Sequence, residues 1–235
     1  MRIWGYWATL AWAFLAFFLG QFAGLAVLLL WRTSDVNSLL ATPFDGATVT
    51  LFIVIANPIM IAVIALAVRI VRARQAEYLA LTLPVAGYLR PALVGLVGLI
   101  VLGDALLYVG GYPLVTPFQL QSYATAAAEG WLPAMLIGAI VVAPAGEEIM
   151  FRGFLFRGWV RSDRSAWPAI VVISLLWAAL HVQYDWTGIL QIFVIGLFLG
   201  WIRWRSASTL LTFLLHALFN AEGTLETVIQ IRFFS

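Results

Sequence analysis

Seven long apolar runs limit what this chain can fold into. A membrane-spanning helix needs about 20 mostly apolar residues to cross the hydrocarbon core of a bilayer. Runs that approach or exceed this length lie near residues 5–31, 47–68, 91–110, 132–157, 167–186, 187–203 and 207–225. Charged residues are only 10% of the 235, too few to cover the surface of a soluble globule. The sequence therefore predicts an all-α, polytopic transmembrane helical bundle of about seven helices, in one integral membrane domain over residues 1–235.

The arginines predict how this bundle is oriented. Short cytoplasmic loops are enriched in Lys and Arg, and all thirteen basic residues here are arginine. A cytoplasmic N-terminus places on the inner side Arg2, Arg69, Arg72, Arg74, Arg90, Arg157, Arg161, Arg164, Arg203 and Arg205. The first run is too long for a signal-peptide core and lacks a small-residue cleavage site, so we expect it to be retained. These features predict a multi-pass membrane protein with its N-terminus in the cytoplasm, and we expect its membrane to be a prokaryotic inner membrane.

Composition also excludes several kinds of chemistry and partner. The chain has no cysteine, which rules out disulfide bonds, cysteine metal ligands and a thiol nucleophile. The net charge of +2 follows from membrane orientation and gives no sign of a nucleic-acid partner. We expect membrane lipid to surround the chain, whereas the sequence gives no indication of its oligomeric state.

Three charged side chains interrupt the run at 132–157, where ionisable groups are a functional-site hypothesis by default. Glu147 and Glu148 are followed by Arg152. Neighbouring helical residues point about 100° apart, so the two glutamates cannot share one role. Glu148 and Arg152, four residues apart, can form an ion pair. That pair would leave Glu147 free to activate a water as a general base. The alternative is a cluster at the membrane edge whose charges only neutralise one another.

The two histidines of the chain, His181 and His216, lie in the later apolar runs. His216 and Asn220 stand four residues apart and therefore share one helical face. An imidazole can bind a metal or move a proton, and an amide N–H can stabilise an oxyanion. The residues leave alternatives open, because His181 could be a packing residue and the His216 face could make an interhelical hydrogen bond.

The depth of these residues provides an internal test. Glu147 and His181 would not meet if the fourth helix ended at Gly146, because Glu147 would then lie at the inner edge of the membrane. The residues meet if the helix continues to about residue 157, at a rise of about 1.5 Å per residue. We therefore predict that residues 147–157 are membrane helix and that Arg152 faces inward.

Taken together, these residues resemble the motifs of the CPBP family of intramembrane metalloproteases, also called the CAAX-protease or Abi family. The resemblance covers about residues 131–221. Glu147, Glu148 and Arg152 match the EExxxR motif, His181 matches the second motif, and His216 with Asn220 matches the third. The second motif usually begins with phenylalanine, and here Trp177 stands in that position. This departure bears on the shape of the pocket more than on catalysis.

The resemblance implies a membrane endopeptidase that cleaves lipidated, CAAX-type proteins or leader and signalling peptides. Glu147 would be the general base, and Asn220 would help to stabilise the oxyanion. His181 and His216 would hold a metal or polarise the scissile carbonyl. Glu147, His181 and His216 suit Zn²⁺ with an open position for water, although metal-free glutamate catalysis remains an alternative.

Two other classes of function remain open. Glutamates and histidines in membrane helices also serve proton-coupled transporters, and a polar cluster can organise a non-catalytic scaffold or immunity protein. Other protease plans lack their motifs, since the chain has no HExxH and no GxSxG. Residues 1–130 match no motif. Asp104 lies deep in the third run. It either makes a polar contact with another helix or supports the residues of the site without belonging to it.

Overall fold

The computed structural model describes residues 2–31 and 45–234, which form helices and no strands. Six long helices are α1 (Tyr6–Trp31), α3 (Gly46–Ile70), α5 (Leu89–Gly110), α10 (Asp163–Ala179), α11 (Trp186–Ser206) and α12 (Thr209–Phe233). Two shorter helices are α4 (Gln75–Tyr78) and α6 (Pro117–Ala128). Between α6 and α10 lies a continuous helix, Leu132–Trp159, built from α7 (Leu132–Ile137), η1 (Gly138–Val142), α8 (Ala143–Glu148), η2 (Ile149–Leu155) and α9 (Phe156–Trp159). We call Leu132–Trp159 the central helix.

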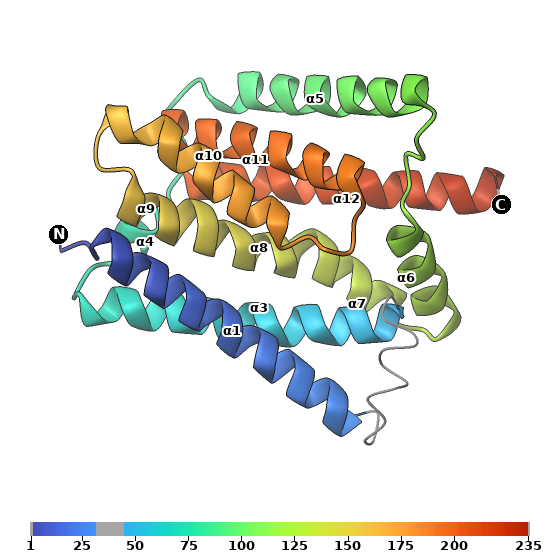
Figure 1. Ribbon diagram of the computed structural model, residues 1–235, viewed down its shortest axis with the longest axis horizontal. Helices are drawn as coiled ribbons and strands as arrows, with labels where there is room; N and C mark the ends of the chain where they lie inside the picture. Colours follow the sequence, from blue (N-terminus) through green and yellow to red (C-terminus); the bar gives the residue numbers. More distant parts are fainter. Residues whose placement is uncertain (1, 32–44, 235) are drawn as a thin grey trace.

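The central helix lies between two groups of helices, with α1 and α3 on one side and α10, α11 and α12 on the other (Figure 1). Helix α5 runs along the outer edge of the second group, and α6 packs against α3 at one end of the bundle. Small residues allow α1 and α3 to approach closely: a Cβ on Gly20 would lie 2.6 Å from the carbonyl oxygen of Ala56. The central helix is therefore enclosed by other helices, and residues 150–156 are all buried.

The prediction of an all-α membrane bundle is confirmed. Among the described residues, five helices are long and apolar enough to cross a membrane, namely α1, α3, α5, the central helix and α11. The other two predicted runs form α10, which has only 17 residues, and α12, which carries two glutamates. The chain is thus an integral membrane protein, whereas its orientation and its inner-membrane location stay predictions.

Two boundaries differ from the sequence analysis. The run at 167–186 was expected to be one helix, but α10 begins at Asp163 and ends at Ala179, so His181 lies in the turn after it. Asp185 then caps α11 by accepting a hydrogen bond from the N–H of Gly188. Helix α6 had no counterpart among the predicted runs, because its twelve residues are too short and too polar to cross a bilayer.

The central helix confirms the prediction that residues 147–157 are helical and that Arg152 faces inward. Arg152 is only 1% exposed. Two π-helical turns, η1 and η2, lie on either side of α8, which contains Pro144 and both glutamates. Pro144 has no N–H to donate, and such turns frequently occur at functional sites. The helix therefore bulges at the glutamates without breaking.

Candidate active site

A cavity of about 590 Å³ opens beside the glutamates of the central helix. Its walls come from α1, α3, α6, the central helix, α10, the α10–α11 turn, α11 and α12. Four of the six predicted site residues line it: Glu147, His181, His216 and Asn220. Glu148 and Arg152 are buried and do not belong to the lining. The structure thus brings all six residues into one region but divides them between the cavity and the protein interior.

Glu148, Arg152 and His216 form what we call the buried ion cluster. One oxygen of Glu148, Oε1, accepts hydrogen bonds from Arg152 Nη1 at 2.8 Å and from His216 Nδ1 at 3.0 Å. Glu148 has no exposed surface and His216 has 3%. A buried carboxylate requires such partners, because an unpaired charge away from water is costly. The predicted Glu148–Arg152 pair is therefore confirmed.

Arg152 also connects the buried ion cluster to two neighbouring helices. Its Nη2 donates to the carbonyl oxygen of Gly196 on α11 at 3.3 Å, and its guanidinium lies 4.3 Å from the centre of the Trp177 ring on α10. A second buried arginine, Arg203, donates from Nε to the carbonyl oxygen of Arg152 at 3.0 Å. These contacts fix the side of the central helix that faces away from the cavity.

Glu147 has different surroundings from Glu148. It is partly exposed at the cavity wall, and the indole N–H of Trp177 donates to its Oε2 at 2.5 Å. The Trp177 ring also packs edge-on against His216 and His181, with centroids 5.1 Å and 5.2 Å away. The sequence analysis treated Trp177 only as a change of pocket shape. Its N–H was the signal for a polar role, since a buried indole usually finds an acceptor.

Both histidines are oriented through the same ring nitrogen. His181 Nδ1 lies 2.8 Å from the carbonyl oxygen of Trp177, and His216 Nδ1 lies 3.0 Å from the Glu148 carboxylate. Both oxygens are acceptors, so each Nδ1 carries a proton and each Nε2 is the nitrogen left for a ligand or substrate. Metal-binding histidines are commonly held in this way by a carbonyl or a carboxylate.

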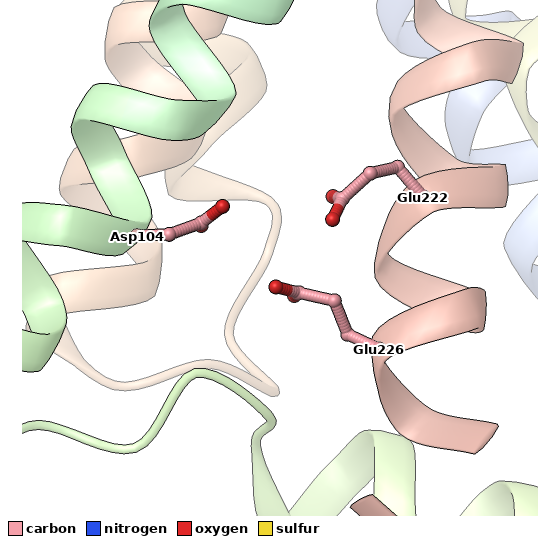
Figure 2. Close-up of side chains that lie close together, drawn as sticks. All are labelled: Asp104, Glu222 and Glu226. Carbon is pink, nitrogen blue, oxygen red and sulfur yellow. The ribbon is translucent and has the colours of Figure 1, made fainter. Parts of the chain in front are cut away.

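Glu147, His181 and His216 are residue types that bind Zn²⁺ in proteins. Those three residues are not a group whose ligand atoms all lie within 4.8 Å of one another. Among the described residues, the group that meets this distance consists of Asp104, Glu222 and Glu226. Figure 2 shows Asp104 of α5 pointing toward the two glutamates of α12. This acidic cluster contains no histidine and lies outside the predicted metal set.

Asn220 makes the interhelical hydrogen bond that the sequence analysis left open. Its Nδ2 donates to the carbonyl oxygen of Ala139 at 2.8 Å. Pro144 lies five residues after Ala139, which is the spacing of a π-helical hydrogen bond, and proline cannot donate it. Asn220 supplies the missing donor. Because a carboxamide has two N–H groups and Asn220 also lines the cavity, its role toward an oxyanion stays a prediction.

The turn after α10 places two further titratable groups near the cavity. Tyr184 stacks on His181 and lines the cavity, and burial followed by the nearby Glu147 carboxylate raises the pKa of its phenol to about 12. The exposed Asp185 accepts hydrogen bonds from the Gly188 N–H and the Thr187 hydroxyl, which lower the pKa of its carboxyl. The stacking of Tyr184 on His181 and the hydrogen bonds to Asp185 thus stabilise the turn that carries His181.

Comparison with known proteins supports a protease-type site. Residues 129–221 match the family model described as type II CAAX prenyl endopeptidase Rce1-like, and this range contains all six predicted site residues. An uncharacterized 24.3 kDa protein of Escherichia coli is 32% identical in an alignment of 142 positions that covers 57% of this chain and 64% of that protein. No solved structure matches the chain significantly. The resemblance to CAAX proteases is therefore confirmed for residues 129–221, while the dependence on a metal stays a prediction.

Proposed function

We propose that this protein is an intramembrane endopeptidase in which Glu147 activates the attacking water. The observation that carries the proposal is the unequal placement of two adjacent carboxylates. Glu148 is sealed in the buried ion cluster, whereas Glu147 lies at the wall of a cavity that also receives both histidines. A general base needs access to water, and of these two adjacent glutamates Glu147 is the one that lines the cavity.

In the proposed reaction, Glu147 takes a proton from a water molecule as the water oxygen attacks the scissile carbonyl carbon. Glu147 then gives this proton to the nitrogen of the departing amine as the C–N bond breaks. The Trp177 indole keeps the Glu147 carboxylate in place, and Glu148 keeps the His216 ring turned toward the cavity. The second N–H of Asn220 would stabilise the oxyanion.

Glu147, His181 and His216 are the residues that would hold a zinc ion. When bound, zinc would polarise the carbonyl and lower the pKa of a bound water. The proposed substrates are lipidated, CAAX-type proteins or leader and signalling peptides of the membrane. The similarity of residues 129–221 to a CAAX prenyl endopeptidase supports this class.

Peptide cleavage by the purified protein in lipid tests the proposal. We expect wild-type protein to cleave members of a library of farnesylated CAAX peptides and leader peptides. Glu147→Gln should lower kcat by about 10²–10⁴-fold, the usual contribution of a general base. Loss of cleavage on adding a chelator would support the metal.

Glu129→Gln is the matched control, because Glu129 is an exposed glutamate just after α6 and does not line the cavity. Cleavage that persists in Glu147→Gln would contradict the proposed role of Glu147. A pH-dependent flux without cleavage would identify a transporter. A protein that neither cleaves nor transports, and whose cellular role survives Glu147→Gln, would be a scaffold or immunity protein.

A further inference from the structure

An asparagine that precedes the matched range 129–221 contacts the segment that carries Glu147. Asn57 lies on α3 and lines the same cavity as Glu147. Its side chain packs against Gly146, a buried residue of α8 and the immediate neighbour of Glu147. A Cβ on Gly146 would lie 2.2 Å from Asn57 Oδ1 and 2.9 Å from Asn57 Cβ. Glycine at position 146 therefore allows α3 to bring this carboxamide against the helix beside Glu147.

The Asn57 carboxamide is held in this place from its own helix. Its Nδ2 donates to the carbonyl oxygen of Ile53, one turn earlier on α3, at 3.1 Å. This hydrogen bond leaves Oδ1 as the atom that lies closest to the Cβ position of Gly146. The Cβ of Asn57 is attached directly to the α3 backbone, so rotation of the side chain cannot move it away from Gly146. The contact therefore sets how closely α3 and α8 approach beside Glu147.

A second carboxamide contacts the same stretch of the central helix from the other group of helices. Asn220 of α12 donates to the carbonyl oxygen of Ala139 at 2.8 Å, and α3 and α12 lie on opposite sides of the central helix (Figure 1). Ala139 and Gly146 precede and follow Pro144, which cannot donate a helical hydrogen bond. Asn57 and Asn220 thus hold the bulged segment from both sides.

The position of this segment matters because it determines where the Glu147 carboxylate lies. The indole N–H of Trp177 donates to Glu147 Oε2, so the carboxylate must remain aligned with a residue on another helix. A methyl group added at Gly146 would have to move by about 1 Å to reach an ordinary contact distance from Asn57. A displacement of about 1 Å can lower an enzymatic rate by about 10²-fold. The contact between Asn57 and Gly146 is therefore close enough to control the alignment of the base.

We infer that Asn57 is a positioning residue for Glu147 and acts through its contact with Gly146. The inference rests on the proposed peptidase function and adds to it a residue from the part of the chain before residue 129. Asn57 fixes the place at which the central helix presents the Glu147 carboxylate to the cavity and to the Trp177 indole. Helix α3 thereby aligns the general base in addition to forming a wall of the cavity.

The indole N–H of Trp177 reports the position of Glu147 without any substrate. Protein labelled with ¹⁵N-tryptophan is studied by NMR in lipid nanodiscs, and Trp177→Phe assigns the resonance among the eleven tryptophans. Glu147→Ala, which has no carboxylate, gives the resonance of the indole without its acceptor. Asn57→Ala and Gly146→Ala should both move the proton resonance of the wild-type indole upfield, toward that position. If Gly146→Ala does not fold, Asn57→Ala alone decides.

Gly158→Ala is the matched control, because Gly158 makes the same kind of close contact on the same central helix. A Cβ on Gly158 would lie 2.2 Å from Thr9 Oγ1 on α1, and neither residue lines the cavity. This variant should lower the free energy of unfolding without moving the Trp177 resonance. An unmoved resonance in Asn57→Ala, or an equal shift in Gly158→Ala, would overturn the inference.

Cleavage assays separate this inference from the proposed function. For a peptide that wild-type protein cleaves, Asn57→Ala should lower kcat by about tenfold and leave KM nearly unchanged, because the misplaced base slows the chemical step. A higher KM at unchanged kcat would show that Asn57 binds substrate and would overturn its positioning role. If wild-type protein cleaves no peptide, the peptidase function fails, whereas the Trp177 resonance still decides whether Asn57 positions Glu147.

Discussion

The two sides of the central helix differ sharply at the adjacent residues Glu147 and Glu148. On the side that faces the protein interior, which we call the inner side of the helix, Glu148 is fully buried and accepts hydrogen bonds from Arg152 and His216. On the cavity side, Glu147 is partly exposed and accepts a hydrogen bond from the Trp177 indole N–H. Because neighbouring helical residues point about 100° apart, one sequence motif supplies both a structural ion cluster and a reactive carboxylate. The comparison separates the residues expected to determine stability from those expected to determine chemistry.

The largest expected effect on stability belongs to the inner side. Arg152→Met would leave the Glu148 charge buried without its main partner, and we expect a loss of about 3–5 kcal/mol in the free energy of unfolding. The measurement is reversible unfolding in mixed micelles. Arg74→Met is the matched control, because its ion pair with Glu77 is solvent-exposed and such pairs contribute at most about 1 kcal/mol. Equal losses in the two variants would contradict the distinction between a buried and an exposed pair.

On the cavity side, Trp177→Phe tests the hydrogen bond to Glu147. Phenylalanine keeps an aromatic ring near Arg152 but removes the N–H donor. Since a hydrogen bond to a charged group contributes about 1.5–3 kcal/mol, we expect kcat/KM to fall by at least about tenfold. Trp7→Phe, at an 83% exposed position, should leave cleavage unchanged. Unchanged kcat/KM in Trp177→Phe would mean that the indole does not hold the carboxylate in its reactive position.

The smallest expected effect is on the titration of Tyr184. Its pKa is raised to about 12 by burial and then by Glu147, so the folded protein favours the neutral phenol. This contribution to stability is present below the usual pKa near 10 and is lost as pH rises toward 12. Glu147→Gln should lower the pKa of Tyr184, whereas Glu148→Gln should not. Phenolate absorbance, with Tyr184→Phe used to assign the transition, provides the measurement. Equal shifts in both glutamate variants would show that the two sides are not electrostatically separate.

The sequence predicted the membrane bundle and the inner side of the site because both depend on local patterns. Apolar length identified the spans, and the spacing of Glu148 and Arg152 identified their ion pair. The same reasoning did not place Trp177 against Glu147, because that contact joins residues thirty positions apart on different helices. It also extended the fifth helix past His181, whereas α10 ends at Ala179 and a polar turn leads from there to Asp185, which caps α11.

The acidic cluster of Asp104, Glu222 and Glu226 shows the same limit. Asp104 stood alone in its apolar run, and nothing in its local sequence indicated a partner on α12. The pairing depends on how α5 packs against α12, which is a property of the whole bundle. Patterns within one helix predicted faces and ion pairs, whereas the charge of the cavity became visible only after the helices were assembled.

A side-by-side comparison of Glu147→Gln and Glu148→Gln in the same lipid preparation tests the central claim most directly. The measured quantities are peptide cleavage and the free energy of unfolding. We expect Glu147→Gln to unfold like wild type while cleavage falls by at least about 10²-fold. We expect Glu148→Gln to lose about 3–5 kcal/mol of stability, because Arg152 is left buried without its carboxylate. Wild-type cleavage by Glu147→Gln, or a Glu148→Gln variant as stable as wild type, would contradict the account.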